Sequence, residues 1–242
     1  MNHLKKARAF LFDMDGLLLD TEDIHIRAYM ELTRQLGVPQ SFESLKRFIG
    51  HSHNVTVRFL KDDLGCEPAF EDLIAREQVI YFEILESERP RPLPGVREMF
   101  DLCEELGLKR ALVSSSVAFQ VGPTMQIVLD HLERRGKWTE HFHVVCTGDR
   151  VKRLKPAPDP YLLAAEELGL APEECIAFED SPAGVTAAHA AGCCVVAIPN
   201  MYLQSAEVAQ DKAHYVYKTL SDAHVHMRQS LNEAETLVRR ST

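Results

Sequence analysis

The sequence predicts an α/β fold, a doubly wound parallel sheet with an inserted α-helical cap domain. Three observations predict it. Short apolar runs recur along the chain, each ends in small or polar residues, and most precede a stretch with helical spacing, which is the pattern of a parallel sheet covered by helices. The first two runs are separated by a long segment of helical character. A proline-rich stretch then returns the chain to the strand pattern.

Six apolar runs are predicted to be strands, because they are too short for helices and are bounded by small and polar residues. The runs are Ala9–Phe12, Arg110–Val113, His143–Cys146, Cys175–Phe178, Cys193–Ile198 and, with the weakest pattern, Tyr215–Tyr217. Helical stretches between successive runs favour a sheet whose strands are parallel. The last segment, residues 220–242, is predicted to be a closing helix.

The segment between the first and second runs is predicted to be helical. Apolar residues keep helical spacing up to Gly37 and again over residues 73–85. Helices inserted between two strands of one sheet predict a cap domain of residues 21–93, which the chain leaves through a proline-rich hinge. The core domain is then discontinuous and consists of residues 1–20 and 94–242.

Charge and composition exclude several classes of partner. The 242 residues carry 27 basic and 36 acidic side chains, a formal charge of -9, which repels nucleic acid and anionic membranes. The apolar run near the N-terminus is too short for a signal peptide or a membrane span. The six cysteines lack zinc-binding spacing and are expected to be reduced, buried thiols. We therefore expect a cytoplasmic protein, and nothing demands more than a monomer.

Reactive side chains follow four of the predicted strands. In an open parallel sheet, ligands bind at the carboxyl ends of the strands. Four groups of residues come after the first four runs in turn: Asp13, Asp15 and Gly16; Ser114, Ser115 and Ser116; Lys155, at a short distance; and Glu179, Asp180 and Ser181. We therefore expect carboxylates, a hydroxyl and an ammonium group at one edge of the sheet.

Several carboxylates at one point repel each other unless a divalent cation lies among them, and oxygen ligands suit Mg²⁺. With Mg²⁺ and Lys155 as cations, such a site would suit a phosphoryl group. Each residue alone also has a structural interpretation. The aspartates after the first run could cap a turn, and Ser181 followed by Pro182 is a good start for a helix. The pattern at four strand ends is what favours a phosphate-ester site.

These residues resemble the four ordered motifs of the haloacid dehalogenase (HAD) superfamily, over essentially the whole chain. The matching segments are Asp13-Met-Asp-Gly-Leu-Leu-Leu-Asp-Thr21, Ala111-Leu-Val-Ser-Ser-Ser116, Lys155-Pro-Ala-Pro-Asp159 and Phe178-Glu-Asp-Ser-Pro-Ala-Gly184. The inserted helices resemble the cap of the branch that contains β-phosphoglucomutase, phosphoglycolate phosphatase and sugar-phosphate phosphatases. The resemblance implies a Rossmann-like core and a phosphoric monoester hydrolase that acts on a small phosphorylated metabolite.

The resemblance also implies roles for individual residues. Asp13 would be the nucleophile that becomes an aspartyl-phosphate, and Asp15 the acid and base. Ser114 and Lys155 would hold phosphoryl oxygens, with Gly16 and Ser115 beside them. Mg²⁺ would be bound by Asp13, Asp180, the backbone carbonyl of Asp15, and Glu179 as a ligand or as a group that orients bound water. The acid at Asp15 argues against dehalogenase or phosphonatase chemistry.

The cap is expected to set specificity, because the core contacts only the phosphoryl group. Candidate substrate contacts are His25 and His53, with Arg47, His51 and Asn54 as weaker ones, although each histidine is about as well explained by packing. His25 keeps open a β-phosphoglucomutase-like activity, but Val117 stands where those relatives have a lysine. A phosphoaspartate signalling module is a further alternative, although such modules lack the long helical insertion.

Overall fold

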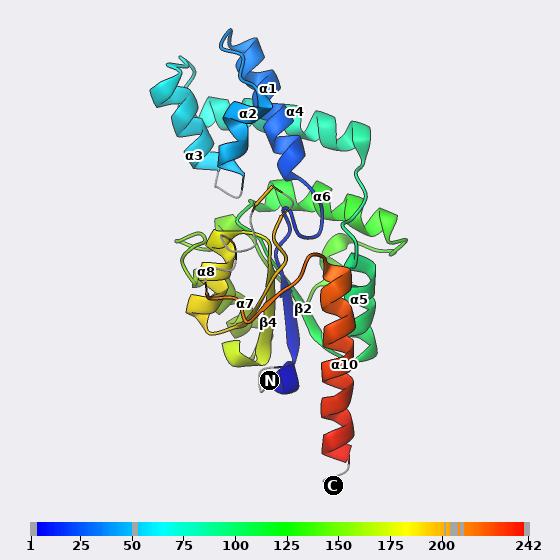
Figure 1. Ribbon diagram of the computed structural model, residues 1–242. Coiled ribbons are helices and arrows are strands. Elements are labelled where there is room, and N and C mark those ends of the chain that lie inside the picture. Colours follow the sequence, from blue (N-terminus) through cyan, green and yellow to red (C-terminus); the bar gives the residue numbers. More distant parts are fainter. Residues whose placement is uncertain (1–3, 50–52, 201, 204–207, 209–210, 240–242) are drawn as a thin grey trace. The chain divides into compact units, whose positions relative to one another are not determined.

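The structure is a computed structural model, and it describes residues 4–49, 53–200, 202–203, 208 and 211–239 (Figure 1). The chain forms two compact units. One consists of Met1–Leu19 with Arg91–Thr242, and the other of Asp20–Pro90. The first unit contains the sheet, and the second contains the inserted helices.

The core unit is built on a six-stranded parallel sheet with the order β3-β2-β1-β4-β5-β6. The strands are β1 (Ala9–Phe12), β2 (Lys109–Val113), β3 (Val144–Cys146), β4 (Cys175–Glu179), β5 (Cys194–Ala197) and β6 (Tyr215–Val216). This topology confirms the predicted doubly wound sheet. The strand order reverses between β1 and β4, and such a switch point is where open α/β sheets bind their ligands.

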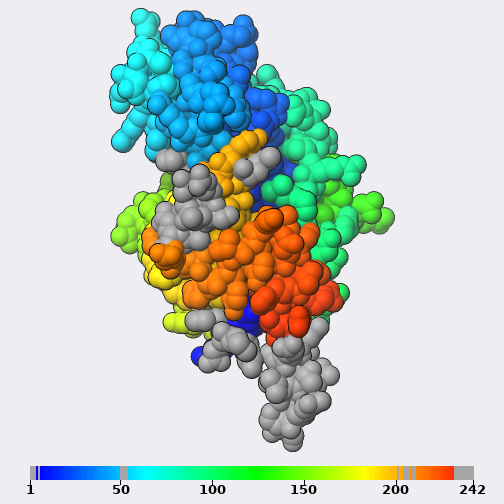
Figure 2. All heavy atoms as spheres, in the orientation of Figure 1, coloured from blue at the N-terminus to red at the C-terminus, as the bar shows by residue number. Residues whose placement is uncertain are grey.

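Strand bounds differ from the predicted runs by at most one residue at either end. The most useful difference concerns β4, which extends through Glu179 because that residue pairs in register with Ala197 of β5. At the edge of the sheet, β6 contains only two residues. Figure 2 shows the orange part of the chain, which includes β6, on the surface of the core unit.

Helices cover both faces of the sheet. They are α5 (Val96–Glu105), α6 (Ala118–His131), α7 (Asp159–Leu168), α8 (Pro182–Ala191) and α10 (Leu220–Arg239), with short 3₁₀ turns η1 (Leu4–Lys6), η4 (Trp138–His141), η5 (Gly148–Arg150) and η6 (Pro172–Glu174). α10 packs against α5 (Figure 1). Its start at Leu220 agrees with the predicted closing helix.

The two faces of the central strands have different cores, because successive side chains of a strand point to opposite faces. Ala9 and Leu11 of β1 belong to a cluster of small and aliphatic residues together with residues of α7 and α8. Phe10 and Phe12 point to the other face, where Phe12 stacks on Phe178 with ring centroids 5.1 Å apart. Burying each such ring stabilises the fold by roughly 2–3 kcal/mol.

The second unit is helical over its described residues, as the sequence predicts. It contains α1 (Glu22–Gln35), α2 (Phe42–Leu45), the 3₁₀ turn η2 (Lys46–Phe48), α3 (His53–Arg58), the π-helical turn η3 (Phe59–Asp63) and α4 (Phe70–Glu88). α1 and α4 pack on each other through buried side chains at helical spacing. These include Ile24, Tyr29 and Leu32 of α1 and Leu73, Ile80 and Tyr81 of α4.

All six cysteines are buried and none is paired in a disulfide among the described residues. Within the part of the chain that the structure describes, no helix combines the length and the apolar content that a bilayer crossing requires.

Candidate active site

Asp13, Ser114, Glu179 and Asp180 lie at the carboxyl ends of three neighbouring strands. Asp13 directly follows β1, Ser114 directly follows β2, and Glu179 is the last residue of β4. The sheet places β2, β1 and β4 side by side, so these residues are close although they are far apart in the sequence. All four are buried.

Strand alternation explains which of these side chains meet. Every second side chain of a strand points to the same face of the sheet. Asp13 therefore shares a face with Ala9 and Leu11, and Glu179 shares it with Cys175 and Ala177. This is the face that packs against α7. Their ligand oxygens and one of Asp180 lie within 4.8 Å of one another. This is the only such cluster of three or more metal-ligating side chains within the described residues.

Lys155 is enclosed by three acceptors. Its ammonium group, with a side chain only 5% exposed, contacts Asp13 Oδ1, lies 2.6 Å from Glu179 Oε1 and donates to the Val113 carbonyl oxygen at 2.8 Å. An ammonium group has three N–H donors, and these contacts use all three. Lys155 therefore pairs with Asp13 in the structure, and it would have to release one acceptor to hold a phosphoryl oxygen.

The charges of the cluster are unbalanced. Burial raises the pKa of Asp13 well above its ordinary range; Lys155 opposes this shift, while Glu179 and Asp15 add to it. For Lys155, burial by itself would lower the pKa, but the Asp13 and Glu179 carboxylates outweigh burial and raise it. One lysine thus faces several carboxyl groups, and these acids cannot all ionise easily without a further cation.

Glu179 is held by a residue that the sequence analysis did not select. The Tyr161 hydroxyl, from α7, donates to Glu179 Oε1. Burial, and then the charges of Glu179 and Asp13, raise the pKa of Tyr161 well above its ordinary range, so its hydroxyl keeps its proton. Glu179 Oε2 is buried and has no hydrogen-bond partner among the residues that the structure describes.

These observations fit a divalent cation. The ligand atoms are all oxygens, which hard cations prefer, and one lysine cannot neutralise all the carboxyl groups of the cluster. A buried oxygen of Glu179 also lacks a hydrogen-bond partner among the described residues. An unsatisfied buried oxygen of this kind is costly unless a cation or a donor reaches it. Asp13, Glu179 and Asp180 are therefore the residues that could hold a metal.

Asp15 is held by the loop that follows β2. Ser116 Oγ donates to Asp15 Oδ2 at 2.8 Å, and Ser114 Oγ does so at 3.3 Å. Ser115 was predicted from the sequence to contact phosphate. Its backbone carbonyl oxygen lies close to Gly148, where an added methyl group would be only 2.2 Å from that oxygen. Three consecutive serines are identical in type, so only the structure distinguishes Ser116 from Ser115.

Gly16 makes room for Asp180. Its φ of +76° is in the left-handed region, and a methyl group at this position would lie 2.1 Å from Asp180 Oδ2 and 2.8 Å from Asn200 Nδ2. The sequence analysis expected Gly16 at the phosphate. It did not select Asn200, although this residue follows the fifth predicted strand and the rule of strand ends would have found it.

The predicted cap residues have different surroundings in the helical unit. His25 Nδ1 lies 2.8 Å from Glu77 Oε1, and the ring stacks on Tyr81 with centroids 4.2 Å apart. His25 is thus engaged with α4, and its side chain is 13% exposed. His53 is the first residue of α3, but its side chain and all of His51 lie outside the described residues.

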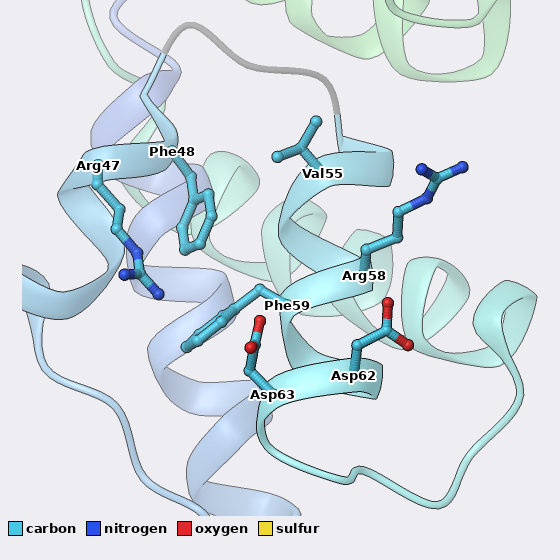
Figure 3. A pocket seen from close by; sticks show the side chains of 7 residues that line it. All are labelled: Arg47, Phe48, Val55, Arg58, Phe59, Asp62 and Asp63. Carbon is cyan, nitrogen blue, oxygen red and sulfur yellow. The ribbon is translucent and has the colours of Figure 1, made fainter.

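A cavity of about 450 Å³ lies within the helical unit (Figure 3). The Arg47 guanidinium carbon is 4.8 Å from the Phe48 ring centroid and 4.6 Å from that of Phe59, a cation–π arrangement. The other lining residues are Val55, Arg58, Asp62 and Asp63. Arg47, one of the cap candidates, thus lines this cavity.

Comparisons with known proteins show which family this chain resembles. The family model for haloacid dehalogenase-like hydrolases matches residues 10–198. CbbY of Rhodobacter capsulatus is 34% identical over 205 residues, which cover 81% of this chain and 87% of that protein. A phosphorylated carbohydrates phosphatase of Thermotoga maritima is 32% identical over 76% of this chain and 81% of its own length.

A crystal structure of a CbbY mutant from Rhodobacter sphaeroides, in complex with xylulose-(1,5)bisphosphate, has a similar fold. It superposes with a TM-score of 0.78 and 26% identity, and the match covers 89% of this chain and 95% of that one.

Proposed function

The chain belongs to the haloacid dehalogenase-like hydrolase family, and from this premise we propose that it is a magnesium-dependent phosphatase of a small phosphorylated metabolite, such as a sugar phosphate. One observation carries the proposal. The buried carboxylates of Asp13, Glu179 and Asp180 converge beside Lys155, and a fourth carboxylate, Asp15, is held by the serine loop after the neighbouring strand β2.

The reaction proposed for these residues has two steps. An oxygen of Asp13 forms a bond to phosphorus while the ester P–O bond breaks, and Asp15 gives its proton to the departing alcohol oxygen. Asp15 then takes a proton from water, whose oxygen attacks phosphorus while the bond to Asp13 breaks. The products are the alcohol and inorganic phosphate, and Asp13 is regenerated.

The remaining residues bind and orient. Ser114 would donate to a phosphoryl oxygen, and Lys155 would neutralise Asp13 before the reaction and a phosphoryl oxygen during it. Asp13, Glu179, Asp180 and the backbone carbonyl of Asp15 would hold Mg²⁺, which when bound supplies the positive charge that this cluster lacks. We propose that the helical unit selects the substrate, with Arg47 and His25 as its candidate residues.

A mutase activity has less support. A phosphosugar mutase needs a second phosphate-binding group. The β-phosphoglucomutase relatives have a lysine at the position after the serines, whereas this chain has Val117, an apolar residue that is 37% exposed. The similar protein from Thermotoga maritima is a phosphatase of phosphorylated carbohydrates by name. Membership of a hydrolase family gives no support to the alternative of a phosphoaspartate signalling module.

Turnover of p-nitrophenyl phosphate with Mg²⁺ tests the proposal. Asp13→Asn should lower kcat by a factor on the order of 10⁴ or more, as expected when a nucleophile is removed. Asp130→Asn, the same change at an exposed position of α6, should keep wild-type turnover. Wild-type protein that is inactive with Mg²⁺, or an Asp13→Asn variant that stays active, would contradict the proposal.

A panel of phosphorylated metabolites would then separate phosphatase from mutase. It should include β-glucose 1-phosphate with its bisphosphate activator. Release of inorganic phosphate from one or more sugar phosphates is expected. Efficient isomerisation with little phosphate release would favour the mutase instead.

A further inference from the structure

We propose that the Tyr161 hydroxyl is a positioning group of the metal site, which holds one oxygen of Glu179 so that the other is left for the cation. The inference rests on the proposed metal-dependent function and deepens it. Tyr161 lies outside the strand ends, in the first turn of α7, and its side chain is fully buried. It would act through Glu179 and would not contact the substrate.

Two donors hold Glu179 Oε1. This oxygen accepts a hydrogen bond from the Tyr161 hydroxyl and lies 2.6 Å from Lys155 Nζ. Lys155 Nζ is in turn 5.3 Å from the centroid of the Tyr161 ring. Two donors on one oxygen fix the carboxylate at that end and occupy the lone pairs that a cation would otherwise use.

The other oxygen of Glu179 has different surroundings. Glu179 Oε2 is buried and lacks a hydrogen-bond partner among the described residues, whereas oxygens of Asp13 and Asp180 lie within 4.8 Å of a Glu179 oxygen. The carboxylate also lies against Gly184 of α8, where a methyl group would be 1.8 Å from Oε2 and 2.2 Å from Oε1. Little room is left for the carboxylate to turn.

Tyr161 and Lys155 differ in the number of acceptors to which they donate. Lys155 divides its three donors among Asp13, Glu179 and Val113, and it must release one of them to hold a phosphoryl oxygen. The Tyr161 hydroxyl has a single proton, which it donates to Glu179. Tyr161 would therefore keep Glu179 in place when Lys155 turns to the substrate.

The test is the affinity of the metal-free protein for Mg²⁺, measured by calorimetric titration with MgCl₂ and no substrate. Tyr161→Phe removes one oxygen atom and keeps the ring. We expect it to raise the Kd for Mg²⁺ about tenfold, the effect of losing one hydrogen bond to a charged group. Tyr29→Phe is the matched control, because Tyr29 is also buried and bonds to Thr56 in the helical unit. It should leave the Kd unchanged.

A double-mutant cycle with Glu179→Gln isolates the coupling. If Tyr161 acts through Glu179, Tyr161→Phe should have little further effect on Mg²⁺ affinity in the Glu179→Gln background. An equal tenfold loss in both backgrounds would overturn the inference. So would a wild-type Kd in Tyr161→Phe accompanied only by a lower melting temperature, since that result assigns the hydroxyl a purely structural role.

Two further outcomes distinguish a failure of the proposed metal site from a failure of the role proposed for Tyr161. If the wild-type protein does not bind Mg²⁺ at all, the proposed metal site is wrong and this inference falls with it. If Tyr161→Phe does not fold, wild-type protein labelled with ¹³C at tyrosine Cζ replaces it. Adding Mg²⁺ should shift the ¹³C NMR signal of Tyr161 and leave the signal of Tyr29 unchanged. A Tyr161 signal that does not shift would overturn the inference.

Discussion

Ser116 Oγ donates a hydrogen bond of 2.8 Å to Asp15 Oδ2. Asp15 comes shortly after β1 and Ser116 shortly after β2, so this bond joins two neighbouring strand ends. The Ser116 backbone N–H also donates to Ser114 Oγ at 3.0 Å, which orders the loop itself. The carboxylate that we propose to transfer the proton is thus oriented by the serine loop.

Ser116→Ala should lower kcat roughly tenfold, because it removes one hydrogen bond to a charged group, and it should change KM little. Steady-state kinetics with p-nitrophenyl phosphate measures both. Ser115→Ala is the informative comparison, since the sequence favoured Ser115 and the structure favours Ser116. A larger loss of kcat in Ser115→Ala would contradict the role of Ser116.

Lys155→Met should lower the free energy of unfolding of the metal-free protein by roughly 3–5 kcal/mol, because it leaves the buried carboxylates of Asp13 and Glu179 without their cation. Urea denaturation followed by circular dichroism measures the change. Lys152→Met, at an exposed position of the same loop, should stay within about 0.5 kcal/mol of wild type. Equal stability of the two variants would show that the ion pairs do not stabilise the core.

Gly16→Ala should abolish Mg²⁺ binding and turnover, because its methyl group would lie 2.1 Å from Asp180 Oδ2. Gly37→Ala is a close control. Its φ of +78° matches the +76° of Gly16, but no atom of the described residues lies within 4 Å of the added methyl group. Both variants should lose about 1–2 kcal/mol from the left-handed backbone, and only Gly16→Ala should lose the metal. If Gly16→Ala bound Mg²⁺ with wild-type affinity, the proposal that Gly16 leaves space for the Asp180 carboxylate would be wrong.

Stabilisation by Mg²⁺ should increase with pH. Burial raises the pKa of Asp13 above its unfolded value of about 3.9, so the folded metal-free protein holds this proton more tightly than the unfolded chain does. The contribution of this group to stability is therefore fully present below the unfolded pKa and is lost as the pH rises through the raised folded pKa. Mg²⁺ binds the ionised carboxylate and competes with that proton.

The rise in melting temperature on adding Mg²⁺ should therefore be larger at about pH 7.5 than at about pH 5.5. Calorimetric scans with and without MgCl₂, at matched ionic strength, measure it. A rise that is the same at both pH values would mean that no buried carboxylate with a raised pKa takes part in binding.

Much of the fold could be predicted because its signals are local. Each strand was visible as a short apolar run, and the helical unit as apolar residues at helical spacing. The rule that ligands bind at strand ends then brought Asp13, Ser114 and Asp180 together before any pairing was known. The end of β4 was placed one residue early, because its last residue is a glutamate whose strand pairing with Ala197 is a long-range contact.

The sequence by itself determined the family, the strand ends and the residue types that could perform the chemistry, since these follow from local patterns and ordered motifs. The tertiary structure decided which side chains meet. Tyr161 reaches Glu179 because α7 packs on the sheet face that Glu179 shares with Asp13. Likewise, Gly16 makes room for Asp180. Such choices depend on side-chain direction and on contacts between residues far apart in the chain, which no local pattern contains.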